Sequence, residues 1–281
     1  MPTVAPQVHR TAEVDPTAEL GEGVVVEQHA SVGPNCVLGA GTRVRRSAII
    51  ERNVTMGRDN DVHPFATIGG DPQDLKYDAD ADEGTLVIGD RNTFRESVTL
   101  NRGAGEAGPT RIGSDCYLMV GAHVGHNTRA GDRVIMGNTA CLAGHVVIDD
   151  GCFLSAFAGV HQFVRVGRLV IFQGGAIATM HVPPFVTTAG FNGVAALNRV
   201  GMRRAGVSRE GMASVKQAFQ HFYRRRAAGE ATTAESLAEA ESMAWAPEGR
   251  EFVAFVEWAT SQPAPRNRGL CRPGRGEGEI A

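Results

Sequence analysis

An apolar side chain recurs at every sixth residue over residues 8–68, 88–100 and 112–178, and this period constrains the fold more than any other feature. All 26 of these positions are apolar although only 42% of the chain is, so chance does not explain the pattern. An even period keeps one face of a β-strand, whereas the apolar stripe of an α-helix recurs every three or four residues. The period therefore predicts strands.

The residues around each in-phase position indicate how the strands are arranged. Strands are normally short, so a pattern of this length must turn a corner every six residues. Glycine often follows the in-phase residue, as at Gly39 and Gly113, and a small residue often lies four positions after it, as at Ala48 and Cys116. We expect the glycine at the corner, where positive φ or close approach is needed, and the small residue inside. The 35 glycines and few aromatic residues fit such a narrow solenoid.

The repeat resembles the hexapeptide repeat of left-handed parallel β-helix proteins, in which three hexapeptides make one triangular coil. This resemblance implies a mainly β fold of about eight to nine coils. We predict a left-handed β-helix domain over residues 1–190, with loops projecting at 69–87 and 101–111, where the period is interrupted. Loops on a rigid scaffold often carry function.

After the repeat ends, the pattern becomes helical. A C-terminal α-helical domain is predicted over residues 191–262, with helices at 192–205, 208–228, 232–245 and 248–261. Residues 263–281 are rich in proline, glycine and arginine and are expected to be disordered.

Charge and cysteine content narrow the function classes. The net charge of −3 excludes a strongly basic nucleic-acid binder. Residues 191–281 carry 13 Lys+Arg and 10 Asp+Glu, a net of +3, which suits either an acidic or phosphate-bearing partner or a solvated helix face. Five cysteines form no CxxC pair, and neither a secretory signal nor a membrane-length apolar run is found. We therefore expect a cytoplasmic protein.

Several segments go beyond the repeat. They are QDLKY (residues 73–77), IGDRNTFRESVTLNRG (88–103), AHVGHN (122–127), LAGHV (142–146), HQF (161–163), VPPF (182–185) and NRVGMRRAGVSRE (198–210). Together they resemble the UDP-N-acetylglucosamine O-acyltransferases of lipid A biosynthesis, over residues 8 to about 262. The resemblance implies transfer of a 3-hydroxyacyl chain from acyl carrier protein to the 3-hydroxyl of the sugar nucleotide. It also implies a homotrimer with active sites between neighbouring chains, and no metal or cofactor.

The resemblance assigns roles to individual residues. His126 matches the general base, which a poorly nucleophilic sugar hydroxyl requires near neutral pH. Gly144 matches the residue whose backbone N–H stabilises the thioester oxyanion. Gly174 falls where the family sets acyl length, and its missing side chain implies a long chain. The remaining implied substrate-binding residues are Asp74, Lys76, His123, His145, His161 and Gln162 on the sugar and acyl side, and Asn198, Arg203 and Arg204 on the nucleotide side, where either arginine could instead meet acidic acyl carrier protein.

The chain departs from the family pattern at four positions. Asn127 follows the predicted base where the family usually has aspartate, so we expect weaker electrostatic support for the imidazolium. Asn101 stands where a histidine is common, and Val200 and Ala205 replace polar or charged types. The last two changes are expected to weaken nucleotide binding or to alter which sugar nucleotide is accepted.

Three other readings remain open. The first is the related N-acyltransferase of the same pathway, whose extra N-terminal domain does not fit before Val8, although a 3-amino acceptor remains possible. The second is a zinc hydratase of the γ-carbonic anhydrase kind, which needs three histidines around one ion. His123 and His126 lie three residues apart and QDLKY has no role there, which argues against zinc. The third is a non-catalytic scaffold, which leaves the loops and histidines unexplained.

Overall fold

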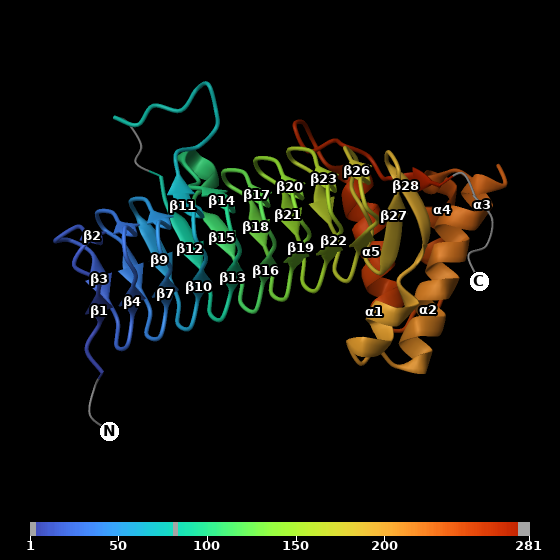
Figure 1. Ribbon diagram of the computed structural model, residues 1–281. Helices are drawn as coiled ribbons and strands as arrows, with labels where there is room; N and C mark the ends of the chain where they lie inside the picture. The colour runs from blue at the N-terminus through green and yellow to red at the C-terminus, as the bar shows by residue number, and fades with distance from the viewer. Residues whose placement is uncertain (1–3, 81–83, 275–281) are drawn as a thin grey trace.

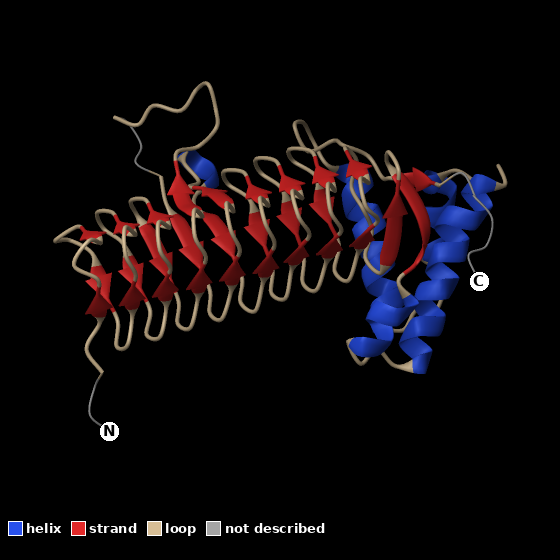
Figure 2. Cartoon of the chain, viewed as in Figure 1, coloured by secondary structure: helices blue, strands red, loops and turns tan. Residues whose placement is uncertain are grey.

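The structure is a computed structural model that describes residues 4–80 and 84–274. It is an elongated three-sided prism of short strands with helices packed at its carboxyl-terminal end (Figure 1). Strands form almost all of the prism, and α-helices are confined to the other part of the chain (Figure 2).

Three parallel sheets form the sides of the prism, because each strand pairs with the strand one coil away. The first sheet contains β1 (Gln7–Val8), β4 (Val25–Val26), β7 (Arg43–Val44), β10 (Asp61–Val62), β13 (Thr93–Phe94), β16 (Tyr117–Leu118), β19 (Ile135–Met136), β22 (Phe153–Leu154) and β25 (Ile171–Phe172). The second contains β2 (Glu13–Val14), β5 (Ser31–Val32), β8 (Ile49–Ile50), β11 (Thr67–Gly70), β14 (Thr99–Asn101), β17 (His123–Val124), β20 (Cys141–Leu142), β23 (Gly159–Val160) and β26 (Ile177–Ala178). The third contains β3 (Glu19–Leu20), β6 (Val37–Leu38), β9 (Val54–Met56), β12 (Leu86–Ile88), β15 (Thr110–Ile112), β18 (Arg129–Ala130), β21 (Val147–Ile148) and β24 (Arg165–Val166).

The core of the prism is built from the six-residue period. Each strand from β1 to β26 carries one in-phase residue, and from Val26 onward every in-phase side chain except Ala130 is buried. Val8 is 46% exposed because it lies in the first coil, where no preceding coil covers it. The prediction of a left-handed parallel β-helix followed by a helical region is confirmed.

The glycines that follow in-phase positions serve close approach rather than positive φ, with Gly69, at a φ of 90°, as the exception. A Cβ atom built on Gly39 would lie 2.4 Å from the carbonyl carbon of Gly57 in the next coil, and one on Gly33 would lie 2.4 Å from the oxygen of Glu51. Positive φ occurs two residues later in the turn, often at non-glycine residues such as Asn35 and Asp59. The adjacent coils therefore leave no room for a side chain at the glycine position.

One edge of the prism carries both loops. We call it the loop corner and define it as the turns that lead from the second sheet to the third. The first loop leaves between β11 and β12, and the second leaves between β14 and β15 and contains the short 3-10 helix η1 (Gly105–Ala107). Both loops stand on the upper edge of the prism in Figure 1. Because parallel coils stack in register, side chains from this corner line up along the prism axis.

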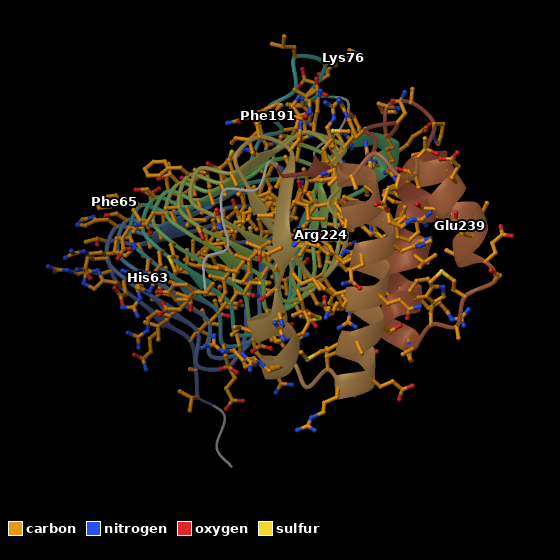
Figure 3. The ribbon with its side chains drawn as sticks, turned by 90° about the vertical axis from the view of Figure 1, so that its right-hand side faces the viewer. His63, Phe65, Lys76, Phe191, Arg224 and Glu239 are labelled. Carbon is orange, nitrogen blue, oxygen red and sulfur yellow. The ribbon has the colours of Figure 1, made fainter. Side chains whose placement is uncertain are left out.

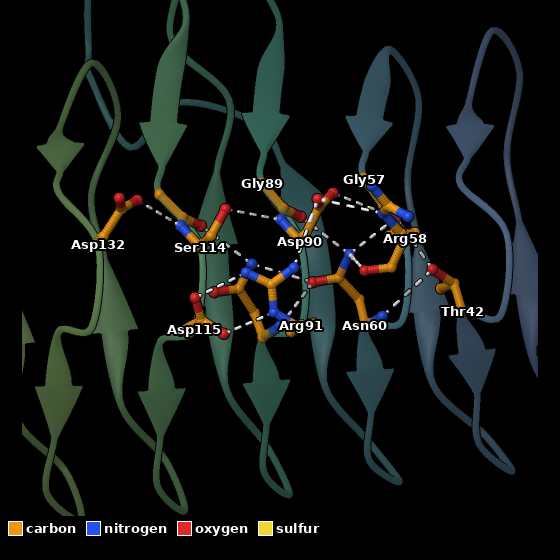
Figure 4. Close-up of polar contacts among 12 residues, drawn as sticks. Thr42, Gly57, Arg58, Asn60, Gly89, Asp90, Arg91, Ser114, Asp115 and Asp132 are labelled. Atoms are coloured by element: carbon orange, nitrogen blue, oxygen red, sulfur yellow. Dashed lines mark hydrogen bonds and ion pairs between the residues drawn. The ribbon is translucent and has the colours of Figure 1, made fainter.

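The turns from the third sheet to the first carry a ladder of polar contacts (Figure 4). In this ladder the N–H of one turn residue donates to the side chain one coil further on. Arg58 N–H donates to Asp90 Oδ1 at 2.9 Å, and Asp90 N–H donates to Ser114 Oγ at 3.0 Å. Ser114 N–H donates to Asp132 Oδ1 at 2.8 Å. These backbone N–H groups thus find their hydrogen-bond acceptors in side chains of the same edge.

The chain leaves the prism through a hairpin rather than directly into a helix. Strand β27 (Val186–Ala189) pairs antiparallel with β28 (Gly193–Leu197), so the helix predicted at 192–205 is wrong over its first half. The hairpin covers the edge of the first sheet, which would otherwise be unpaired. The helix α1 (Arg199–Arg204) begins only after Asn198, whose side chain caps it.

The remaining helices lie near their predicted ranges. They are α2 (Arg209–Phe219), the π-helical turn η2 (Gln220–Arg224), α3 (Arg225–Ala227), α4 (Thr233–Ala240) and α5 (Pro247–Ser261). Ser208 Oγ accepts from Gly211 N–H at 2.9 Å and caps α2 as the sequence indicates. Residues 209–227 form one helical run, close to the prediction of 208–228.

The expected disorder does not hold for residues 263–274. Strand β29 (Arg272–Pro273) pairs in parallel with β28, and the side chains of Leu270 and Cys271 are buried. Tyr223 Oη donates to Cys271 O at 3.0 Å. Burial of these two apolar side chains stabilises an ordered conformation, although the composition of the segment is typical of disorder. Residues 275–281 lie outside the described part of the chain.

Candidate active site

Most of the predicted catalytic and sugar-side residues lie along the loop corner. His126, Gly144 and Gln162 are the second residues after the ends of β17, β20 and β23, and Asn127, His145 and Phe163 are the third. His145 N–H donates to His126 O at 2.9 Å, and Phe163 N–H donates to Gly144 O at 3.2 Å. A spacing of 18 residues, one coil, therefore brings these side chains into one row.

A pocket of about 360 Å³ lies where the two loops meet this row. It is lined by Pro72, Asp74, Lys76, Tyr77 and Asp78 of the first loop, Ala104, Gly105, Glu106 and Ala107 of the second, and His126, Asn127 and His145 of the corner. Two of the loop residues and two of the histidines predicted from sequence therefore share one concave surface.

The imidazole of His126 is held in one orientation by Asn127. Nδ1 of His126 lies 2.8 Å from Oδ1 of Asn127. The Asn127 amide nitrogen donates to Ala104 O at 2.8 Å and to Gly108 O at 2.7 Å, so the amide oxygen must face the imidazole. Nδ1 of His126 is then the donor, and Nε2 carries the lone pair that a general base needs.

Gly144 lies directly beside the basic nitrogen of His126. A Cβ atom at Gly144 would be only 2.6 Å from His126 Nε2, so glycine alone leaves room for the imidazole. Within residues 4–80 and 84–274, the Gly144 N–H donates no hydrogen bond. Pro16 and Pro34 occupy the equivalent turn position in earlier coils, so the fold itself does not need this N–H. A base and an open backbone donor thus stand side by side.

His145 and Phe163 extend the row beyond His126. The ring of His145 makes an edge contact with His126, with centroids 5.1 Å apart, and stacks on Phe163 at 4.6 Å. Burial lowers the pKa of His145, and the charges of His126 and Arg266 lower it further. A neutral His145 can both donate to and accept from a sugar hydroxyl. Phe163 is not among the predicted site residues, although the 18-residue spacing from His145 points to it.

The other predicted histidines lie around the pocket rather than in its wall. His123 is half-buried on the outer face of the second sheet, where its Nδ1 lies 2.8 Å from Thr99 Oγ1. Burial lowers the pKa of His123, with a further contribution from His126. His161 and Gln162 are exposed one coil beyond Gly144. These three side chains flank the row of His126 and His145 without lining the pocket.

Lys76 and Asp74 belong to the first loop, and the base of this loop determines their position. Asp74 Oδ1 accepts from Lys76 N–H at 3.0 Å, and Lys76 lies at the outer end of the loop (Figure 3). The base of the loop is clasped by Arg102, a guanidinium with 1% exposure that donates to Gly69 O and to Asp71 Oδ1. Sequence reasoning missed Arg102, because nothing in the motif shows that its charge is buried.

Gly174 lies on a different corner from His126, in the turn from the first sheet to the second. A Cβ atom there would meet only Ala156 O, at 3.7 Å, so the space outside Gly174 is open. His126 follows β17 and Gly174 precedes β26, three strands further along the second sheet. At the usual spacing between strands this corresponds to about 14 Å along the prism.

The predicted nucleotide-side residues are not brought to the pocket within one chain. Asn198 is buried, donates to Leu169 O at 2.7 Å and accepts from Gly201 N–H at 2.8 Å, so both ends of its amide bond the protein. Arg203 and Arg204 are exposed at the end of α1. This helix lies toward the edge of the molecule opposite the two loops (Figure 1).

Neither a metal-binding cluster nor a membrane-spanning helix is found in residues 4–80 and 84–274. In the described residues, no group of three or more His, Cys, Asp or Glu side chains is arranged to hold a metal ion. None of the described helices is long and apolar enough to cross a membrane.

Comparison with known proteins gives consistent matches. A family described as UDP-N-acetylglucosamine O-acyltransferase, domain 2, matches residues 181–271. An acyl-[acyl-carrier-protein]–UDP-N-acetylglucosamine O-acyltransferase from Herminiimonas arsenicoxydans is 45% identical over 253 residues, which are 89% of this chain and 96% of that protein. The protein of the same name from Janthinobacterium sp. (strain Marseille) is 48% identical over 77% of this chain and 83% of its own length.

Solved structures give the same result. The UDP-N-acetylglucosamine acyltransferase of Francisella novicida superposes with a TM-score of 0.86 at 29% identity, covering 95% of this chain and 94% of that one. The enzyme from Bacteroides fragilis superposes with a TM-score of 0.85 at 32% identity, covering 94% of this chain and 99% of that one.

Proposed function

The chain belongs to the family of acyl-[acyl-carrier-protein]–UDP-N-acetylglucosamine O-acyltransferases, and on that premise we propose that it carries out the first step of lipid A biosynthesis. It moves a 3-hydroxyacyl chain from acyl carrier protein to the 3-hydroxyl of UDP-N-acetylglucosamine. The observation that best supports this chemistry is the position of His126 Nε2 beside the open N–H of Gly144, at the edge of a pocket walled by both loops.

In the proposed reaction, His126 Nε2 removes the proton of the sugar 3-hydroxyl while the oxygen attacks the thioester carbonyl. The new C–O bond produces a tetrahedral oxyanion, which the N–H of Gly144 stabilises. Collapse of the intermediate breaks the C–S bond, and the His126 imidazolium returns its proton to the departing carrier thiolate. Asn127 keeps Nδ1 protonated throughout, so only Nε2 exchanges a proton.

The pocket residues support binding of the sugar. We propose that Asp74, Lys76 and His145 contact it directly, because all three line the pocket with His126. His123, His161 and Gln162 flank the acyl and sugar path on the same corner and the adjoining face. No metal or cofactor enters these steps.

We propose a homotrimer in which a neighbouring chain completes each site. Arg203 and Arg204 lie toward the opposite edge from the loops of their own chain, so a nucleotide in the pocket can meet them only from another copy. The amide nitrogen and oxygen of Asn198 both form hydrogen bonds within the protein, so we propose that Asn198 acts by fixing the position of α1 and not by contacting the nucleotide. Exposed apolar side chains on the prism, such as Phe157 at 68% and Val120 at 42%, suit a packed interface. Light scattering of the purified protein tests this assembly.

Gly174 and the second sheet suit a long acyl chain. The outer face between His126 and Gly174 carries the small residues Cys141 and Gly159, and the space at Gly174 is open. We therefore propose that the acyl chain runs along this face and that the side chain at position 174 sets its length.

A 3-amino sugar nucleotide is the second candidate acceptor, and Asn127 favours it. An uncharged amide stabilises the imidazolium less than a carboxylate does, and an amine is a better nucleophile that depends less on the base.

We also propose a cytoplasmic location. All five cysteines are free, and four of them are buried in the core, which suits a reducing compartment.

The deciding experiment offers the purified protein UDP-N-acetylglucosamine, its 3-amino analogue and 3-hydroxyacyl carrier thioesters of several lengths. We expect acylation of UDP-N-acetylglucosamine at the 3-position with the longer chains preferred. Acylation of the amino analogue alone would assign N-acyl transfer instead, and acylation of neither sugar would refute the proposal.

A further inference from the structure

The segment that follows α5 returns to the loop corner. His181 lies two coils beyond His145 in that corner, and the segment runs alongside it. His181 N–H donates to Gly269 O at 2.8 Å, and Cys271 N–H donates to His181 O at 2.9 Å. His181 Nε2 also lies 2.8 Å from Arg266 O. The carboxyl-terminal segment is therefore fastened to the row of turns that contains the candidate active site.

Two arginines of this segment lie beside the row. The guanidinium of Arg268 lies 5.8 Å from the ring centroid of Phe163, which stacks on His145, which in turn contacts His126. Burial and the charges of His126 and Arg266 lower the pKa of His145, whereas the charge of Asp74 in the pocket wall raises it. A continuous series of side-chain contacts thus leads from Arg268 to the candidate base.

These arginines differ from the paired arginines on the prism. Arg91 donates to Asp115, and Arg45 to Asp61, through two parallel hydrogen bonds from Nε and Nη2. In the described part of the chain, Arg266 and Arg268 form no ion pair, and Nε of Arg268 is buried without a hydrogen-bond partner. Residues 262–274 contain no Asp or Glu at all. The segment therefore brings uncompensated positive charge to the end of the site.

We propose that Arg266 and Arg268 form an anion subsite at the carboxyl-terminal end of the loop corner, which binds a phosphate of a substrate whose reacting group lies over His126. This inference rests on the proposed function, whose two substrates both carry phosphate. The sugar nucleotide has a diphosphate, and the carrier has the phosphodiester of its phosphopantetheine arm. Guanidinium groups suit phosphate because they donate two parallel hydrogen bonds. Two coils separate the turns of His145 and His181, or about 10 Å.

The test compares the wild type with Arg266→Gln, Arg268→Gln and the double variant, with Arg272→Gln as control. Arg272 lies in the same segment, where its exposed side chain forms no ion pair within the described residues. Thermal melting checks that the segment stays docked. We expect the double variant to raise one KM on the order of tenfold or more at a kcat within about twofold of wild type.

The choice of substrates distinguishes the two phosphates. A higher KM for UDP-N-acetylglucosamine at saturating acyl carrier protein assigns the subsite to the nucleotide. A higher KM for an acyl-phosphopantetheine, with no change for the acyl-pantetheine that lacks phosphate, assigns it to the carrier. If neither KM rises above that of the Arg272→Gln control, or if both thioesters are affected equally, the subsite is refuted.

Direct binding separates this inference from the proposed reaction. Calorimetric titration with UDP-N-acetylglucosamine and with phosphopantetheine needs no turnover. Weaker binding of either compound by the double variant would support the subsite even if the wild type acylated neither sugar. Equal binding of both compounds by the wild type and the double variant would overturn it even in an active enzyme.

Discussion

The side-chain oxygen of Asn127 accepts the Nδ1 proton of His126 at 2.8 Å, although asparagine carries no charge. The contact depends on the second loop, because Ala104 O and Gly108 O take both amide protons and leave the oxygen facing the imidazole. The substitution of asparagine for the usual aspartate therefore preserves the orientation of the base while removing a negative charge beside it.

Replacing Asn127 by aspartate should move the acidic limb of the kcat/KM profile to higher pH by about one unit, because a neighbouring carboxylate stabilises the imidazolium. The same change removes two donors to the half-buried carbonyls of Ala104 and Gly108 and should lower the free energy of unfolding by about 1–3 kcal/mol. Rate measurements across pH 5–9 check the first effect. An unshifted limb would mean that position 127 does not act on the base.

Gly144→Ala should lower kcat by about a hundredfold, because its Cβ atom occupies the space of His126 Nε2 and displaces the imidazole. Gly174→Ala changes the same turn position on another corner, where the nearest atom is 3.7 Å away. It serves as the matched control only with an acyl chain short enough to end before position 174. With such a short-chain thioester, the single-turnover rates of the two variants should differ widely at equal melting temperatures. Equal rates for the two variants would refute a role for Gly144 in the reaction.

Arg102→Met should loosen the base of the first loop. The change keeps the volume of the buried side chain but leaves Gly69 O without its guanidinium partner, at about 1–3 kcal/mol in the free energy of unfolding. The KM for the sugar nucleotide should also rise, because Asp74 and Lys76 lose their support. Arg91→Met removes an exposed arginine and should lower the free energy of unfolding much less, without affecting KM. Similar values for the two variants would contradict the role of Arg102.

Stability should fall as pH drops below about 6.5, and His181 should contribute to the loss. His181 is fully buried, its Nδ1 accepts from Arg165 N–H at 2.9 Å, and its Nε2–H donates to Arg266 O, so only the neutral ring fits. Burial lowers the pKa of His181 from the model-compound value of 6.5, so the unfolded chain takes up the proton first. Urea unfolding from pH 8 to pH 5 should show a shallower decline for His181→Asn than for the wild type. Parallel declines of the two proteins would exclude His181 as a source of the pH dependence of stability.

The prism was predictable because its rules are local and repeated. A buried residue at every sixth position specifies a strand, a face and a corner at once, so the 18-residue spacing already places His126, Gly144 and Gln162 in one row. The role of the recurrent glycine was less accessible. Positive φ and close approach both favour glycine in a sequence, and only the stacking of coils shows that Gly39 is required for close approach.

Contacts between distant segments could not be predicted. The burial of Arg102 depends on the first loop folding back onto the second, and the role of Asn127 depends on two carbonyl groups some 20 residues away. The carboxyl-terminal segment has a composition typical of disorder, yet Leu270 and Cys271 find a socket that exists only after the hairpin and helices have formed. No residue near Leu270 or Cys271 in the sequence indicates that they pack against the hairpin and the helices.

The rate of acyl transfer by His126→Ala tests the central claim most directly. With UDP-N-acetylglucosamine and a saturating 3-hydroxyacyl carrier thioester, loss of the general base should lower kcat by about 10²- to 10⁴-fold while the melting temperature stays that of the wild type. Transfer at the wild-type rate by a folded His126→Ala protein would contradict the account, because the three atoms nearest to a Cβ at Gly144 all belong to the His126 imidazole.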